Sequence, residues 1–494
     1  MMNKTFTDDK PQPTANPDRA PPAHPPSSTS GKRSGESLTL CKSLTDPHFQ
    51  GLSGPNQFYL HYFGTELNKS YVIYDDPIRN PFRQSVSYTA EHRAFREIVI
   101  ANSAMHAFRK LYASNTGSQD RQTPVPNARP AQSPLHYPIT NPYQDALIAK
   151  QRAIRLLAQG IDQGTLNTDV VFGCVLLFVT LSFLHADQNE VQVHQRGLRE
   201  VLKNPSVTPF TKDKALRIFR NSFLTDIALY DALETALFPS RACNTPLYSS
   251  QITLFENADE HHHFACPWEI VRATIKIADL SKSAAPPSRN VRDEIRFCVD
   301  QVEALDVSKW AALSPASSPP SNKPSTSGRL GHLETRMHIA EAYKSAFHVF
   351  AARLLRADPC LQRAARSHFG RIVHHLSHVP AADDGFKATS WPAFVAGLES
   401  EEHAASAWAL AHLRAVCATV PWAYVWRAAE TVERTMRARF TAEGGLAEPG
   451  RVELSRQVMA GFPVIQQGGS LLCDGALRAA MPAAEAWVFR GLAQ

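Results

Sequence analysis

Apolar residues recur at intervals of three and four along most of the chain, whereas no segment alternates with the period of two that marks half-buried strands. Thr89 is expected to cap the first long helix, because its hydroxyl can accept from a free amide of the first turn. The apolar stripe that follows reads Phe95, Ile98, Val99, Met105, Phe108 and Tyr112. The pattern predicts an all-α fold, a multi-helix bundle with antiparallel helices of differing length.

Asn141 and Pro142 mark another helix start, since Asn caps free amides and Pro fits the position whose amide has no partner. Gln144 stands where a capping box places its glutamine. The buried stripe of this helix is predicted to be Leu147, Ile154, Leu157 and Ile161. Two more helices are predicted over residues 215–238 and 291–305, the second with the inward residues Val291, Ile295, Val299 and Val302.

Residues 170–186 carry no formal charge and are bounded by Asp169 and Asp187. This length is at the lower limit for crossing a bilayer of about 30 Å. The segment also contains Thr180, Ser182 and His185, and Lys and Arg do not gather on one side of it. We therefore expect a central helix that is buried on all sides, and no membrane span.

Proline and serine divide the chain. Residues 1–50 form a Pro/Ser-rich tail that we expect to be disordered, because it cannot bury enough apolar surface to become ordered. Similar Pro/Ser-rich loops are predicted at about residues 115–140 and 312–329, and a second helical block is expected to begin near Leu333. We place no domain boundary at these loops, so residues 51–494 are predicted to form one helical domain.

Composition adds little to this picture. Of 494 residues, 43% are hydrophobic and 20% are charged, and the formal charge of +6 is small for this length, which gives only weak long-range attraction to nucleic acid or anionic lipid. The eight cysteines are scattered, and we expect reduced thiols in a core. They are Cys41, Cys174, Cys243, Cys266, Cys298, Cys360, Cys417 and Cys473.

Several segments occur in an order that resembles one family. A loop from Asp75 to Arg83, with the pattern Asp-Asp-Pro-x-x-x-Pro-Phe-Arg, precedes the first long helix. A His-x-Arg-Gly segment begins at His194, an Ala-Glu-Ala-Tyr segment at Ala340, and a Trp-Pro-x-Phe-x-Ala-Gly segment at Trp391. Over roughly residues 55–440 these resemble the fungal-specific transcription factor domain that lies C-terminal to binuclear zinc clusters.

The resemblance implies an all-helical regulatory region, a nuclear location and control of transcription, often of a biosynthetic gene cluster for a secondary metabolite. It further implies that the partners are other transcription factors or coactivators, with dimer formation as an additional expectation. The many apolar helices could also line a cavity for a small-molecule effector. DNA would then be reached only indirectly, unless a zinc cluster lies upstream of this chain.

The zinc cluster itself has no counterpart in this sequence. A binuclear cluster needs six closely spaced thiolates, yet Cys41 is the single cysteine before Cys174. Residues 1–60 show no other DNA-binding pattern either. Three interpretations remain open: the chain works through a DNA-bound partner, it is a defective paralogue, or it is an incomplete gene product.

Histidine and arginine clusters are the remaining candidates for chemistry. His374 and His378 share a helix face as zinc ligands can, so a metal-dependent enzyme of unknown substrate is the alternative function, although no Glu lies between them as general base. Residues 261–263 with Cys266 are better explained as a polar loop, and five arginines between residues 353 and 371 as a solvated helix face. We therefore predict no enzyme activity and no cofactor, and assign no catalytic, cofactor-binding, metal-binding or DNA-binding residue.

Overall fold

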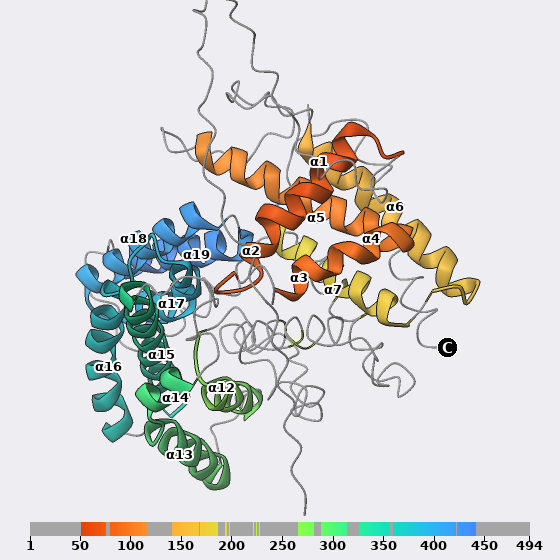
Figure 1. The fold of residues 1–494 in the computed structure, drawn as a ribbon. Coiled ribbons are helices and arrows are strands. Elements are labelled where there is room, and N and C mark those ends of the chain that lie inside the picture. Colours follow the sequence, from red (N-terminus) through yellow and green to blue (C-terminus); the bar gives the residue numbers. More distant parts are fainter. Residues whose placement is uncertain are drawn as a thin grey trace, which may run out of the picture. The chain divides into compact units, whose positions relative to one another are not determined.

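The structure is a computed structural model that describes residues 51–75, 80–115, 141–166, 168–185, 265–280, 288–313, 326–355, 359–420 and 422–440, together with six single positions between 193 and 227. All of these belong to the unit formed by residues 48–494. The described residues form helices and no strand (Figure 1). The predicted all-α fold is thus confirmed, whereas the tail, most of both loops and the helix at 215–238 lie essentially outside the described residues.

Short helices open the described part of the chain: α1 (Gly54–Tyr62), the π turn η3 (Phe63–Leu67), α2 (Asn68–Ser70), α3 (Pro81–Gln84), the 3-10 turn η4 (Ser85–Ser87) and α4 (Tyr88–Glu91). Three long helices follow: α5 (Arg93–Asn115), α6 (Pro142–Asp162) and α7 (Thr168–His185). Phe108, late in α5, packs on Tyr143 at the start of α6, with 5.2 Å between ring centroids. The two helices thus lie side by side and antiparallel.

The predicted cap at Thr89 is wrong. Thr89 lies inside α4, and its hydroxyl donates to the carbonyl of Val86 at 2.6 Å instead of accepting from an amide ahead of it. His92, with φ of −116° and ψ of 100°, separates α4 from α5, which begins at Arg93. A threonine hydroxyl can bond backward or forward along the backbone, and spacing alone does not distinguish these two uses.

The start of α6 is confirmed, while its buried stripe is shifted. The side-chain oxygen of Asn141 accepts from the amide of Gln144 at 3.1 Å, and Pro142 begins the helix. Leu147 and Ile161 are only partly buried. The buried positions are Pro142, Ala146, Ala149, Lys150, Ala153, Ile154, Leu157 and Gly160. The small residues in this set allow α5 to approach α6 closely.

Helix α7 is buried as predicted. Its apolar side chains from Val170 to Leu184 are almost all inaccessible to solvent, and α5, α6 and α19 pack against it. Asn102 of α5 donates to the carbonyl of Leu177 at 3.1 Å, and Arg109 of α5 donates to the carbonyls of Leu184 and His185 at 3.0 and 2.9 Å. Among the helices that the structure describes, none has the length and hydrophobicity needed to span a bilayer.

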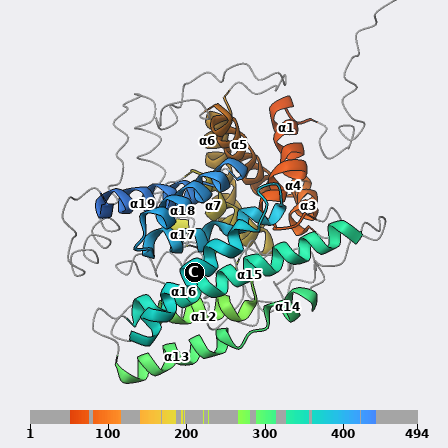
Figure 2. The same cartoon turned by 90° about the vertical axis from the view of Figure 1, so that its left-hand side faces the viewer.

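The second half of the chain contains α12 (Trp268–Leu280), α13 (Arg289–Glu303), α14 (Val307–Leu313), α15 (Thr326–Leu354), α16 (Pro359–Ser377), the 3-10 turn η6 (Asp384–Thr389), α17 (Ser390–Glu399), α18 (His403–Thr419) and α19 (Ala423–Phe440). Helices α15 and α16 lie side by side, with α12 to α14 along α15 (Figure 2). The prediction at 291–305 corresponds to α13, whose inner residues are Ile295, Cys298, Val299 and Val302. Helix α15 begins seven residues before the predicted Leu333.

Two segments of the family resemblance meet at one contact. The ring of Tyr343 on α15 stacks on Trp391 of α17, with centroids 5.2 Å apart, and its hydroxyl donates to the carbonyl of Ala388 at 2.9 Å. Gly397, also on α17, lies where a Cβ would come within 2.8 Å of Val432 and 3.1 Å of Ala409. These residues hold α17 tightly against α15, α18 and α19.

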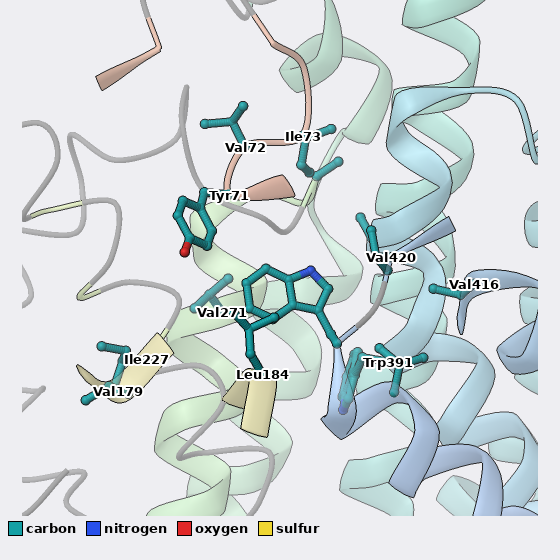
Figure 3. Close-up of a cluster of buried hydrophobic side chains, with 14 of the residues drawn as sticks. Tyr71, Val72, Ile73, Val179, Leu184, Ile227, Val271, Trp391, Val416 and Val420 are labelled. Carbon is teal, nitrogen blue, oxygen red and sulfur yellow. The ribbon is translucent and has the colours of Figure 1, made fainter. Parts of the chain in front are cut away.

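One apolar cluster joins the two halves of the chain. Figure 3 shows side chains of Tyr71 to Ile73, of α7, of α12 and of α17 and α18 gathered together, and all of them belong to a single buried core. Such a core couples segments that are more than 300 residues apart in the sequence. The free energy of unfolding therefore depends on contacts that only the complete unit can make.

Replacement of Trp391 by Ala tests this core. Trp391 is 7% exposed, so loss of its ring leaves a cavity and should lower the free energy of unfolding by about 3 to 5 kcal/mol. Trp426, which is 37% exposed on α19, provides the matched control, and Trp426→Ala should cost less than about 1 kcal/mol. Denaturant unfolding of both variants measures the difference, and equal losses would contradict the proposed packing.

Glycine substitutions test the close approach of α17. Gly397→Ala should destabilise the protein by about 1 to 3 kcal/mol, because the new methyl group overlaps Val432 and Ala409. At Gly370, on α16, an added Cβ would meet no atom within 4 Å, so Gly370→Ala should stabilise by about 0.5 to 1 kcal/mol. Thermal melts compare the two, and a Gly397→Ala variant as stable as wild type would refute the steric argument.

Candidate functional site

The loop that leads the family resemblance is closed by an ion pair. Two nitrogens of Arg83 donate to the carboxylate of Asp75, and a third donates to the carbonyl of Gly64 at 2.8 Å. Asn80 donates to the same carboxylate at 2.8 Å and caps α3 by accepting from the amide of Phe82 at 2.9 Å. Burial alone would raise the pKa of Asp75, but the hydrogen bonds from Arg83 and Asn80 lower it overall. The described residues of this loop thus have a structural role, because they close the loop and cap α3.

Lys387 connects this region to η6. Its ammonium group donates to the carbonyl of Lys69 at 2.7 Å, across 318 residues of sequence. Burial lowers the pKa of Lys387 to about 8, while nearby Asp384 and Asp75 oppose that shift. Lys387 therefore remains mainly charged at neutral pH and holds the end of α2 against the second half of the chain.

Four histidines form a cluster between α15 and α16, here called the histidine cluster: His338, His374, His375 and His378. The ring of His338 stacks on that of His378 with centroids 4.8 Å apart, and its Nδ1 lies 3.1 Å from Nδ1 of His375. That short distance requires one of the two rings to donate and the other to accept. The cluster is half-buried at His338 and His375 and exposed at His374 and His378.

The cluster does not have the arrangement of a metal site. The rings of His374 and His378 are 4.6 Å apart, and Nδ1 of His378 donates to the carbonyl of His374 at 2.8 Å, which leaves Nε2 as the other ring nitrogen. No group of three or more His, Cys, Asp or Glu side chains suited to a metal ion occurs in the described part of the chain. The geometry therefore gives no support to the alternative of a metal-dependent enzyme at His374 and His378.

A second histidine pair lies deeper between the same helices. The rings of His348 and His368 stack in parallel with centroids 4.4 Å apart. Nε2 of His348 lies 2.9 Å from a carboxylate oxygen of Glu303, and Lys344 donates to the carbonyls of Glu303 and Leu305 at 2.6 and 3.3 Å. This network fixes the C-terminal end of α13 against α15.

The remaining candidates are accounted for individually. Arg353 pairs with Glu399 at 2.7 Å and Arg371 with Glu341 at 3.3 Å, whereas Arg363 and Arg366 are exposed. Arg356 and residues 261–263 lie outside the described residues. The cysteines for which the structure describes a side chain are buried: Cys174, Cys266, Cys298 and Cys417.

Sequence reasoning missed several residues that the fold brings together. His338 and His348 reach α16 only because α15 and α16 pack side by side, and their spacing along α15 follows no ligand pattern. Lys344 follows directly on the Ala-Glu-Ala-Tyr segment, and that adjacency was the one available signal for it. Long-range hydrogen bonds such as that of Lys387 leave no trace in local sequence.

The pKa values of His338, His348, His368 and His375 are all lowered from the ordinary histidine value. Burial, with a smaller contribution from neighbouring charges, lowers the pKa of His368 and of His375 to about 4. Burial likewise lowers the pKa of His338 and, despite the opposing effect of Glu303, that of His348. The folded protein thus favours the neutral form of these four rings, while the unfolded chain titrates them near pH 6.5.

The free energy of unfolding should therefore fall as the pH is lowered. Between pH 6.5 and about 4 the unfolded chain binds more protons than the folded one, so the stabilisation is complete above pH 6.5 and is lost as the pH falls. We expect a lower melting temperature at pH 5 than at pH 7.5, and a smaller drop for His375→Gln. Ser377→Ala, an exposed neighbour without a titrating group, is the control and should retain the wild-type drop. An unchanged drop in His375→Gln would show that this ring does not contribute.

Comparison with known proteins agrees with the family resemblance found in the sequence. The model of the fungal specific transcription factor domain matches residues 58–435. The chain is similar to the acriflavine sensitivity control protein acr-2 of Neurospora crassa, with 24% identity over 426 residues, which is 83% of this chain and 66% of that protein. The chain thus spans about two thirds of the length of this relative. No solved structure matches the chain of 494 residues.

The matched range begins within α1 and ends within α19, so it includes the two halves of the buried core, the Asp75–Arg83 ion pair and the contact between Tyr343 and Trp391. The family match therefore refers to the scaffold as a whole and not to one short motif. On this ground the chain belongs to the fungal specific transcription factor domain family. The family and the relative point to a transcription regulator and not to an enzyme.

Proposed function

We propose that this chain is a nuclear regulator that controls transcription through contacts with other proteins, such as transcription factors or coactivators. The observation that carries this proposal is the match of the family model to the helical scaffold over residues 58–435. The sequence of residues 1–494 contains no closely spaced cysteine pairs that could hold a zinc cluster. DNA is then reached through a DNA-bound partner or through a zinc cluster upstream of these residues.

The set of target genes is a second part of the proposal. The family resemblance favours a biosynthetic gene cluster for a secondary metabolite. The name of the Neurospora crassa relative, which describes control of sensitivity to acriflavine, favours genes that respond to a toxic compound. Both target sets agree with a chain that senses a small molecule among its helices and passes the signal to a partner or to a second copy of itself.

A gene deletion tests the function. Fluorescently labelled full-length protein should accumulate in nuclei, and deletion of its gene should raise or lower a defined set of transcripts. Reintroduction of the wild-type gene should restore them, whereas an allele with Trp391→Ala should do so less well, because its folded fraction is smaller. RNA profiles that do not change on deletion, under growth with and without acriflavine, would contradict the proposal.

A further inference from the structure

The solvent-exposed face of α16 carries positive charge and no acidic residue. Residues 359–377 contain three arginines and three histidines but no Asp or Glu. Most of the exposed positions follow helical spacing along one side, and we call this set the α16 face: Arg363, Arg366, Ser367, Gly370, His374 and Ser377. The opposite side of the helix, with Ala365, His368, Ile372 and Leu376, is buried. The exposed side is therefore uniformly basic or neutral.

The two arginines of this face are not used inside the described structure. Arg371, beside the face, pairs with Glu341 of α15, and Arg353 pairs with Glu399. Neither Arg363 nor Arg366 forms a salt bridge with any described residue. Two guanidinium groups one helical turn apart are thus presented to solvent, with forked donors that suit carboxylates.

Gly370 lies in the middle of the same face. Glycine inside a helix costs about 0.5 to 1 kcal/mol relative to alanine. Its φ is not in the left-handed region, and a Cβ built there meets no atom within 4 Å, so neither backbone geometry nor internal packing requires glycine at this position. The absence of a side chain between Arg366 and His374 instead leaves a place where the backbone of another chain can come close to α16.

We propose that the α16 face docks an acidic helical segment of a partner protein, with carboxylates on Arg363 and Arg366 and the backbone of the segment against Gly370. This inference rests on the proposed function, because it names the surface and the chemistry of the partner. The face from Arg363 to Ser377 is about 21 Å long, which corresponds to about four turns of a straight helix. A helix that approaches a glycine can pack at a short interaxial distance and bring its carboxylates to both arginines.

Charge favours a protein over a nucleic acid as the occupant. Binding to DNA gains its affinity from the number of phosphates that cationic side chains neutralise, and this face offers two arginines. An acidic peptide needs only two well-placed carboxylates to pair with both guanidinium groups. His374, at the other end of the face, adds an imidazole that can donate or accept a hydrogen bond.

A tethered reporter tests the inference in the cell. The full-length chain is fused to a heterologous DNA-binding domain and placed upstream of a reporter gene in fungal nuclei. The double variant R363E/R366E should lower the reporter response about tenfold, because it replaces two attractive charge pairs by repulsive ones. G370W should lose a similar amount, because the indole occupies the space left above the helix.

The matched control is R289E/R292E on α13, which makes the same change in net charge at two exposed arginines on a different helix. This variant should keep the wild-type response. If wild type itself leaves the reporter unchanged, the proposed function fails. If wild type is active and both α16 variants remain as active as the control, the function stands and the docking inference is overturned.

A binding measurement with purified full-length protein decides the chemistry of the occupant. The probe is a synthetic helical peptide of about 20 residues with Glu repeated at i and i+4, and its counterpart has Gln at the same positions. Fluorescence anisotropy should show binding of the Glu peptide alone, weakened about tenfold by R363E/R366E and by G370W but not by R289E/R292E. Equal binding of the Gln peptide, or complete displacement by an unrelated DNA duplex, would overturn the inference.

Discussion

Burial of α7 is the constraint on which the rest of the fold depends. A helix with no polar face has to be covered on every side, and here α5, α6 and α19 supply the cover. The hydroxyls of Thr180 and Ser182 bond to carbonyls of α7 itself at 3.1 and 2.9 Å, so they place no unpaired polar group in the core. The first and last long helices described must therefore meet on the same element, which brings the two halves of the chain into contact through α7.

Buried and partly buried cations at helix ends complement this apolar core. Arg109 donates to the last carbonyls of α7, and Lys387 donates to the carbonyl of Lys69 in α2. Lys344 donates to the carbonyl of Glu303 at the end of α13 and to that of Leu305 just beyond it. The carbonyls at a helix C-terminus lack partners within the helix and carry partial negative charge, so a positive side chain satisfies both needs. In each case the donor comes from another helix, and the hydrogen bond thereby fixes how two helices are placed relative to each other.

The sequence predicted the elements better than their connections. Period and capping residues identified α6, α7 and α13 closely, because these helices depend on local patterns such as Asn141 before Pro142. The start of α5 was missed, since Thr89 bonds backward to Val86. For the candidate site, the histidines of α16 were visible in the sequence, but their partners His338 and His348 on α15 depend on tertiary packing, which no local spacing encodes.

The residues that define the resemblance to the family belong to the scaffold. Asp75 and Arg83 close a loop, Tyr343 and Trp391 stack between helices, and Gly397 permits close packing. Residues used in this way specify a fold: Tyr343, Trp391 and Gly397 are buried, and the partly exposed Asp75 and Arg83 already pair with each other. Selection of a partner has to depend on exposed side chains that packing does not constrain. Arg363 and Arg366 on α16 are of this kind, because their charge has no counterpart in the described structure and a helix without acidic residues presents them.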